Sequence, residues 1–266
     1  MAADPSGDMT LDPLLLRARG LWETLAGAPV SFASSGGPAG PDVVVSPASA
    51  LCPGSWAGIV VLGDAAIATA PTEDVARVLR TAFSPLLPAS LTRPETVRAA
   101  LPVPVADVLG PATLAYLSGA DFRPARADDC ASGRVDSLGC DHPDFQGLLR
   151  SADPEDVAES GMEEITSPAF VVREGTDVVA AAGYRAWPFG TAHICVLTHP
   201  RWRGRRLARH TGYAAVAHAL TAGRLPQWRA RPPASRRVAR SLGFRELGSQ
   251  LSVRFEVGGL GDASRG

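Results

Sequence analysis

The chain has 266 residues, of which 45% are apolar, so it is long enough for one large domain or two small ones with a real core. The formal net charge is only -1. No apolar run approaches the ~18 residues that a membrane-spanning helix needs, and the acidic amino terminus has no apolar signal core. The sequence therefore predicts a soluble, cytoplasmic protein and excludes a helical membrane span.

The near-neutral average hides a sharp separation of charge along the chain. Residues 178–245 contain thirteen Arg and no Asp or Glu, whereas residues 1–177 contain eleven Arg against twenty-four Asp and Glu. Such a basic carboxy-terminal third indicates a localised anionic ligand. The chain has no Lys. Arg binds phosphate bidentately, but a GC-rich genome explains the missing Lys better than phosphate recognition does.

The cysteines do not predict a metal site. Cys52, Cys130, Cys140 and Cys195 are scattered without C-x-x-C spacing. The run Cys140-Asp-His142 lacks the second pair of ligands that a zinc site requires. We therefore expect reduced, unligated thiols and no bound metal.

The first half of the chain predicts a small α/β unit, residues 1–125. Apolar residues at helical spacing predict a helix over 11–26, and a Gly/Pro-rich loop over 32–42 follows. Thr72 is the expected N-cap of a second helix, which runs to about Phe83. Short apolar runs between the loop and this helix predict strands at 42–45, 57–62 and 65–70, the last two as a hairpin. Polar residues 121–135 are the expected linker.

The second half, residues 126–266, predicts mixed α/β structure. Short helices are expected at 144–151 and 154–160, and longer ones at 205–221 and 233–241. Strands are expected at 169–172, 177–186, 192–198 and 225–230, with a last strand or hairpin at 244–257. This order alternates helices and strands without the regular βαβ repeat of a parallel sheet.

Residues 194–208, I-C-V-L-T-H-P-R-W-R-G-R-R-L-A, combine a strand, a short basic loop and the start of a helix. The first amides of a helix lack partners within the helix, and the helix dipole places positive charge there. A loop of this kind aims backbone N–H groups at an anion. It is the most direct indication of a ligand in the sequence.

Three segments in this order resemble the GNAT superfamily of acyl-CoA-dependent N-acyltransferases, over about residues 160–257. They are V-L-T-H-P-R-W-R-G-R-R-L-A, P-Q-W-R-A-R at 226–231, and P-P-A-S-R-R-V-A-R-S-L-G-F at 232–244. The resemblance implies a mixed β-sheet flanked by helices and splayed between strands 192–198 and 225–230, with the smaller amino-terminal α/β domain ahead of it. It also implies acetyl-CoA as the acyl donor and no metal.

The resemblance also assigns a cofactor loop, in which Arg203 takes the first position, Arg206 the usual Gly position and Ala208 the small last position. Backbone amides from Gly204 to Arg209 are expected to hold the pyrophosphate, and the preceding strand to pair with the pantetheine arm. Arg206 departs from the family pattern and is compatible only with ordinary helical φ and ψ. The implied cofactor residues are Val196, Leu197, Thr198, Arg203, Gly204, Arg205, Arg206, Leu207, Ala208 and Arg209.

For catalysis, the resemblance places a backbone N–H near Leu197 on the thioester carbonyl. The family often protonates the leaving thiolate with a Tyr four residues before the Gly of Leu-Gly-Phe, but this chain has Ala239 there. Ser235 or Tyr213 is the alternative acid, although a core aromatic is the better interpretation of Tyr213. Residues that can serve as general base are Glu163, Glu164, Glu174 and His199, although the Glu pair is more typical of a solvated turn and His199 of a structural turn residue.

The leading hypothesis is an N-acyltransferase that moves an acetyl group from acetyl-CoA to a primary amine by direct attack in a ternary complex. The acidic amino-terminal domain suggests a cationic acceptor, and a homodimer is among the assemblies that the sequence leaves open. The alternatives are a catalytically silent acyl-CoA-binding sensor, suggested by Ala239, and an Arg-rich nucleic-acid binder. The acidic remainder of the chain opposes the approach of a nucleic acid, and no membrane contact is expected.

Overall fold

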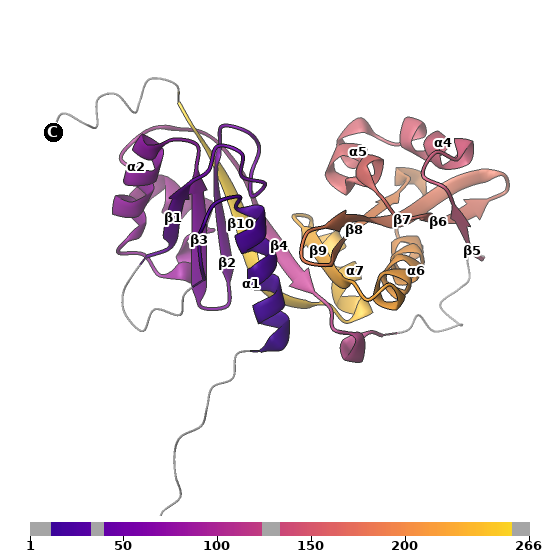
Figure 1. Ribbon diagram of the computed structural model, residues 1–266. Helices are drawn as coiled ribbons and strands as arrows, with labels where there is room; N and C mark the ends of the chain where they lie inside the picture. Colours follow the sequence, from indigo (N-terminus) through magenta and orange to yellow (C-terminus); the bar gives the residue numbers. More distant parts are fainter. Residues whose placement is uncertain (1–11, 33–39, 124–133, 257–266) are drawn as a thin grey trace, which may run out of the picture.

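The computed structural model describes residues 12–32, 40–123 and 134–256, and all of its strands join one mixed sheet (Figure 1). The sheet order is β1-β3-β2-β10-β4-β9-β8-β7-β6-β5. β1 pairs with β3 and β8 with β9 in parallel, and the other pairs are antiparallel. The strands are β1 Asp42–Val45, β2 Ala57–Leu62, β3 Ala65–Ala70, β4 Val105–Tyr116, β5 Val135–Leu138, β6 Ala169–Glu174, β7 Asp177–Trp187, β8 Thr191–Thr198, β9 Leu225–Ala230 and β10 Arg245–Phe255.

Helices cover both faces of each half of the sheet, which confirms the expected fold class (Figure 1). In the first half, α1 packs on one face and α2 and α3 on the other. In the second half, α4 and α5 cover one face, and α6 and α7 cover the other. No helix in the described ranges is long and apolar enough to cross a bilayer. The helices are α1 Pro13–Leu25, α2 Glu73–Phe83, α3 Pro94–Ala100, α4 Pro143–Ser151, α5 Pro154–Ser160, α6 Leu207–Thr221 and α7 Pro233–Leu242, with short 3₁₀ turns η1 Pro88–Ser90, η2 Gly119–Asp121, η4 Met162–Glu164 and η5 Pro200–Trp202.

Local signals predicted most elements correctly. Both strands of the β2–β3 hairpin are buried along their whole length, as expected of apolar runs. Thr72 caps α2 as predicted, because its side-chain oxygen accepts a hydrogen bond from the Val75 N–H at 3.4 Å. We did not predict β4, since its first half is largely exposed and a Gly-Pro pair at 110–111 interrupts its pattern.

The last strand crosses the predicted boundary between residues 125 and 126. β10 pairs with β2 through Gly248–Val253 and with β4 through Arg245–Phe255. The carboxy-terminal strand therefore completes the amino-terminal half of the sheet, instead of staying with the unit from which it comes. The division into residues 1–125 and 126–266 remains a prediction about folding units, but the two parts share one hydrogen-bonded sheet.

A buried aromatic contact also joins the two halves. Trp22 on α1 donates its indole N–H to the hydroxyl of Tyr116 on β4 at 2.5 Å. The Trp22 ring meets the edge of Trp187 at the end of β7, with ring centroids 6.1 Å apart and an angle of 84° between the planes. Because Trp22 and Tyr116 are fully buried, this contact fixes the position of Trp187 from the amino-terminal side.

Gly248 provides a test of the inserted strand. A Cβ at this position would lie 1.8 Å from the Val61 carbonyl oxygen of β2, so no side chain fits without moving the backbone. We expect Gly248→Ala to lower the free energy of unfolding by about 2 to 3 kcal/mol, measured by denaturant unfolding. Gly147→Ala is the matched control, because a Cβ within α4 meets nothing within 4 Å and should stabilise the helix by about 0.5–1 kcal/mol. Equal stability of Gly248→Ala and wild type would contradict this packing.

Candidate functional site

The site begins where β8 and β9 separate. The two strands pair only at Thr191–His193 against Leu225–Gln227, and β8 continues without this partner to Thr198. The other edge of β8 stays paired with β7 along its whole length. The sheet therefore opens between β8 and β9, which is the predicted splay.

Strand alternation decides which amides face this opening. The His199 N–H donates to the Val179 carbonyl on β7 at 3.0 Å. In an antiparallel ladder alternate residues bond to the same neighbour, so Leu197 directs its N–H toward β7 as well. The amides of Val196 and Thr198, which lie beyond the last residue paired with β9, face the gap instead. The Leu197 amide therefore faces β7 and not the gap, which the sequence could not reveal because it does not show the hydrogen-bonding side of each residue.

A groove of about 940 Å³ lies along the opening. It is bounded by β8, the loop at 203–206, the start of α6, and α7. The structure brings nearly all the predicted cofactor residues to this groove: Val196, Leu197, Thr198, Arg203, Gly204, Arg206, Leu207, Ala208 and Arg209. Arg205 is the exception, since its guanidinium lies over the Trp202 ring at 4.4 Å and is not part of the lining.

The loop reaches α6 through two residues with left-handed backbone. Gly204 has φ +80°, and Arg206 has φ 61° and ψ 10° at the N-cap of the helix. Our expectation of helical φ and ψ at Arg206 was wrong, because the chain turns into α6 at this position. A left-handed backbone costs a residue with a Cβ roughly 1–2 kcal/mol, so Arg206 occupies a conformation that favours Gly.

The start of α6 has the character of an anion site. Its first turn contains no acidic residue, and the N-cap makes no side-chain capping bond. The leading amides, including those of Leu207 and Ala208, therefore point out of the helix toward the groove. Arg237 of α7 adds positive charge from the opposite wall.

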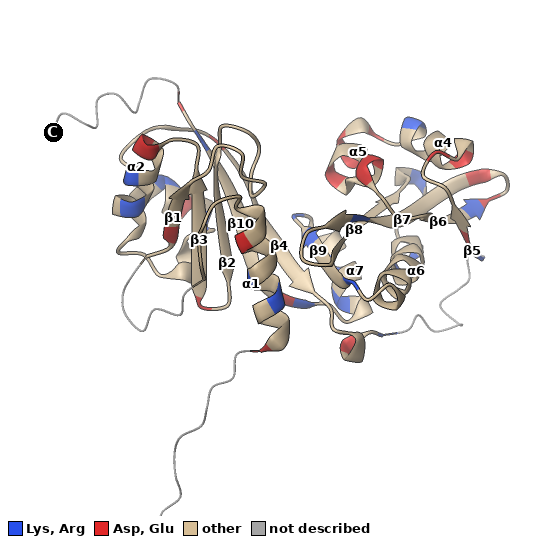
Figure 2. Cartoon of the chain, in the orientation of Figure 1, with Lys and Arg blue, Asp and Glu red and all other residues tan. Residues whose placement is uncertain are grey.

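Acidic residues of α5 moderate this charge. Figure 2 shows them on α5, whereas α7 carries Arg residues. Asp156 of α5 lines the groove and pairs with Arg203 at 2.5 Å. An anion bound at this loop must compete with Asp156 for Arg203.

Ser235 lies in the groove, but Tyr213 does not line it. The Trp228 indole N–H donates to the Ser235 hydroxyl oxygen at 2.9 Å, which leaves the Ser235 O–H able to donate into the groove. Tyr213 stacks on Phe122 with ring centroids 5.0 Å apart and an angle of 13°. Ala239, in the family's Tyr position, lies on the side of α7 that is buried against the core. Of the two alternative acids, Ser235 alone has the required placement.

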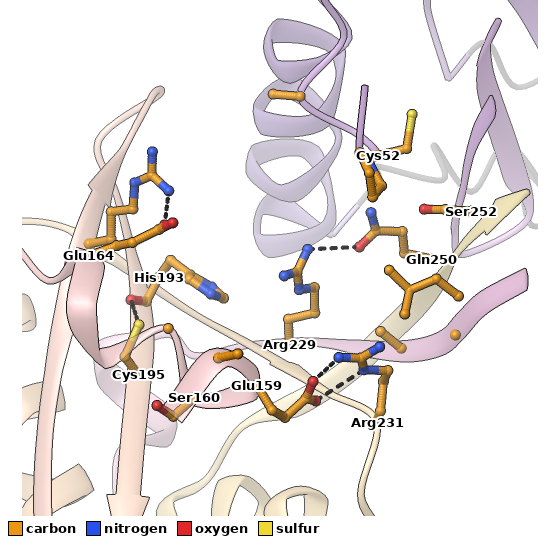
Figure 3. Close-up of a pocket in the computed structure, with 18 of the residues that line it drawn as sticks. Cys52, Glu159, Ser160, Glu164, His193, Cys195, Arg229, Arg231, Gln250 and Ser252 are labelled. Carbon is orange, nitrogen blue, oxygen red and sulfur yellow. Dashed lines mark hydrogen bonds and ion pairs between the residues drawn. The ribbon is translucent and has the colours of Figure 1, made fainter. Parts of the chain in front are cut away.

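A second cavity of about 350 Å³ meets the groove (Figure 3). Glu159, Ser160, Ile194 and Arg229 line both spaces, so the second cavity opens at the inner end of the splay. Its opposite wall comes from the amino-terminal half and β10, through residues such as Leu51, Cys52 and Gln250. Both halves of the chain therefore build this cavity.

Of the predicted pair Glu163 and Glu164, the structure places only Glu164 at a cavity. Glu164 lines the second cavity and forms an ion pair with Arg185 of β7. Glu163 is exposed and is not part of the lining. Glu174 ends β6 in the turn before β7, and the His199 ring accepts a hydrogen bond from the Arg201 N–H at 3.3 Å, which caps η5. The geometry favours Glu164 among the four sequence candidates.

His193 lines the second cavity and was not among our candidate site residues. Its Nδ1 lies 2.5 Å from the Gln227 side-chain oxygen, and its ring stacks on Trp187 at 4.2 Å. Burial lowers the pKa of His193 to about 3, and the Arg229 and Arg185 charges act in the same direction. The ring is therefore neutral at neutral pH. With Nδ1–H donating to Gln227, Nε2 is left as a hydrogen-bond acceptor in the cavity.

The thiols in this cavity are not activated. Burial raises the pKa of Cys52 to about 11 and that of Cys195 to about 12, so both stay protonated at neutral pH. Cys130 lies outside the described residues. Within the described ranges, no three His, Cys, Asp or Glu side chains are grouped as metal ligands.

Residues 167–249 match the family model described as GNAT acetyltransferase. This part of the chain belongs to the GNAT superfamily. The matched stretch begins before β6 and ends within β10, so it includes the splay and the cofactor loop. A GNAT assignment makes this an acyltransferase domain that uses an acyl-CoA cosubstrate. A comparison with curated proteins finds no match.

Several solved structures are similar to the chain. A putative GNAT acetyltransferase from Novosphingobium aromaticivorans is 20% identical, with 58% of this chain and 68% of that chain covered and a TM-score of 0.43. A GCN5-related N-acetyltransferase from Kribbella flavida is 15% identical, with 63% and 65% covered and a TM-score of 0.47. The chain thus spans about two thirds of the length of these structures. At these identities and scores, the assignment rests on the family model.

The low pKa of the partly buried His193 predicts a pH dependence of stability. At about pH 6.5 and above, neither the folded nor the unfolded state holds the proton, whereas between about 3 and 6.5 only the unfolded state binds it. Below about pH 6.5, wild-type stability should therefore fall with decreasing pH more steeply than that of His193→Gln, by up to about 1.4 kcal/mol per pH unit. Denaturant unfolding between about pH 7.5 and 5 measures this difference. Parallel curves for the two proteins would show that His193 titrates normally.

Proposed function

We propose that the chain is an N-acyltransferase that moves an acetyl group from acetyl-CoA to a primary amine by direct attack in a ternary complex. The observation that supports this most strongly is the meeting of two cavities at Ile194 and Arg229. A donor in the groove and an acceptor in the smaller cavity have their reactive ends at the same point, so transfer needs no covalent enzyme intermediate.

The groove suits the donor. The splay-facing amide of Thr198 is positioned to pair with the pantetheine arm, as it would with β9 if that strand continued alongside. The start of α6 and Arg206 are placed to hold the pyrophosphate. A volume of about 940 Å³ lies within the range of cofactor sites.

The chemistry requires an oxyanion donor, a proton for the leaving thiolate and a proton acceptor for the amine. The Val196 N–H is the first splay-facing amide beyond the paired residues of β8 and β9, and it serves as the donor to the thioester oxygen. Ser235 protonates the leaving thiolate from the groove side. The attacking amine is neutral, and the proton that it loses passes toward His193 Nε2 or Glu164, directly or through water.

The acceptor cavity limits the substrate. A volume of about 350 Å³ is at the low end for ligand pockets, which favours a small molecule over a large surface. The described amino-terminal residues that line it carry no acidic side chain. The acidic residues among the described part of the first 125 positions thus do not line the cavity. They therefore give no support to our expectation of a cationic acceptor.

Acetyl-CoA binding tests the donor site. Micromolar affinity corresponds to about 8 kcal/mol, and each charge-assisted phosphate bond contributes roughly 1.5–3 kcal/mol. Calorimetric titration should show micromolar binding to wild type and at least about tenfold weaker binding to Arg203→Ala with Arg206→Ala. Arg205→Ala is the discriminating control, because its guanidinium lies outside the groove and its loss should change Kd less than about threefold. No binding by the folded wild type would refute the proposal.

Substitution of Ser235 tests its proposed role as the general acid. We expect Ser235→Ala to lower kcat about 10²-fold with acetyl-CoA affinity unchanged, because its hydroxyl acts on the leaving thiolate and not on the bound cofactor. Release of free CoA thiol in the presence of an active amine measures kcat. Ser151→Ala is the control, since that hydroxyl donates to the Leu148 carbonyl within α4. An unchanged kcat would exclude Ser235 as the acid.

One result would favour the silent acyl-CoA-binding sensor. Ala239 is buried in the core, so no family-type Tyr reaches the groove from its position. Tight acetyl-CoA binding by wild type, without turnover across a broad amine panel, would separate binding from catalysis and support the sensor.

A further inference from the structure

We propose that the acceptor amine also carries a carboxylate, as an amino acid does, and that Arg229 binds this carboxylate. The inference rests on the proposed function, because it defines the substrate class of the same acceptor cavity. It is drawn from the charges in that cavity and from the way in which Arg229 is held.

Arg229 is held in place by a relay from the amino-terminal half. Gln250 on β10 donates its amide N–H to the Leu51 carbonyl, which orients its side-chain oxygen. That oxygen accepts a hydrogen bond from Arg229 Nη1 at 3.4 Å. Figure 3 shows the Arg229 side chain extending into the cavity toward Gln250, with His193 approaching from the opposite wall. The guanidinium is fixed by one neutral contact, which leaves its other donors available.

The other charges of the cavity are paired. Arg185 forms an ion pair with Glu164, and Arg231 forms one with Glu159 (Figure 3). Among the described residues, no carboxylate forms an ion pair with Arg229. Arg229 is exposed at the cavity surface, although desolvation by the neighbouring protein lowers its pKa. A guanidinium that lines a cavity and forms no ion pair there is open to an anionic ligand, and Arg can bind a carboxylate through two parallel hydrogen bonds.

The phosphates of the cofactor are not the anion that we expect at Arg229. Its phosphates are expected at the start of α6, beside Arg203 and Arg206, at the far end of the groove from the junction. Arg229 instead lies where the acceptor enters, between the Ile194 wall and Gln250. A carboxylate on Arg229 leaves an amine within the same small molecule free to lie beside His193 and the thioester.

The rest of the cavity suits an amino-acid-like ligand. Trp187 and His193 form a flat aromatic wall, with an angle of 9° between their planes. Leu51, Leu109 and Ala50 supply an apolar wall on the opposite side. The volume of about 350 Å³ admits a single small molecule.

The experiment compares each common L-amino acid with the amine that its decarboxylation would give, using acetyl-CoA as donor and wild-type full-length protein. The probes include phenylalanine with phenethylamine, and leucine with 3-methylbutylamine. We expect the amino acid of an active pair to exceed its amine in kcat/KM by about 10- to 150-fold, the range of one charge-assisted hydrogen bond. Arg229→Gln should raise KM for the amino acid by a similar factor, abolish the preference and leave the acetyl-CoA Kd unchanged.

Two further variants keep the test clear of folding effects. Arg229→Lys keeps the charge but loses the planar fork, so its KM should lie between those of wild type and Arg229→Gln. Arg98→Gln, exposed on α3 and away from the cavity, should behave as wild type. Calorimetric titration with the N-acetyl amino acid provides a readout without turnover, and its binding should be lost in Arg229→Gln.

The outcomes separate this inference from the proposed function. Equal transfer to amino acids and their decarboxylated amines, with KM unaffected in Arg229→Gln, overturns the inference while the transferase stands. Arg229-dependent binding of an N-acetyl amino acid without any transfer supports the carboxylate site and overturns the transferase. Failure of the amino acids and N-acetyl amino acids to bind the folded protein overturns the inference.

Discussion

The early end of the parallel pairing between β8 and β9 is the constraint on which the site depends. Three residues of each strand pair, and β8 then continues with one edge lacking a strand. Backbone N–H and C=O groups inside a protein need partners, so an internal edge of this kind is stable only where solvent or a ligand satisfies it. The groove is the consequence. Its walls are the two diverging strands, and its end is the start of α6, where further amides lack partners.

The divergence is held open from the amino-terminal side. β9 is flanked by β4, which pairs with it at Thr113–Tyr116, and β4 is flanked in turn by β10. The last strand of the chain therefore anchors the half of the sheet that carries Arg229. It also contributes Gln250, which contacts Leu51 and Arg229 together. Trp22 stabilises the opposite wall of the acceptor cavity, because it contacts Trp187, whose ring stacks on His193. The acceptor cavity is thus a product of both halves of the chain.

The sequence predicted what depends on neighbouring residues. The strand, basic loop and helix at 194–208 could be recognised because turn chemistry and periodicity are local. The hydrogen-bonding side of Leu197 could not, since it depends on register with β7. Nor could the left-handed backbone of Arg206, where the geometry of the turn prevails over the preference of the residue. The place of β10 between β2 and β4, and the contacts of Gln227 and Gln250, join residues far apart in the sequence, so no spacing indicates them.

Charge in the acceptor cavity couples substrate recognition to proton transfer. Burial is the main cause of the low pKa of His193. Arg229 and Arg185 lower this pKa further, whereas Gln227 raises it by accepting a hydrogen bond from the ring. Arg185 is already neutralised by Glu164, so Arg229 is the cation whose influence a ligand can change. A carboxylate bound to Arg229 offsets this charge and lets the pKa of His193 rise. The ring then becomes a better proton acceptor when the acceptor is in place, and the amine that belongs to that molecule is the group beside it. In the empty cavity the same ring stays a weak base, so binding and proton acceptance are linked through one Arg side chain.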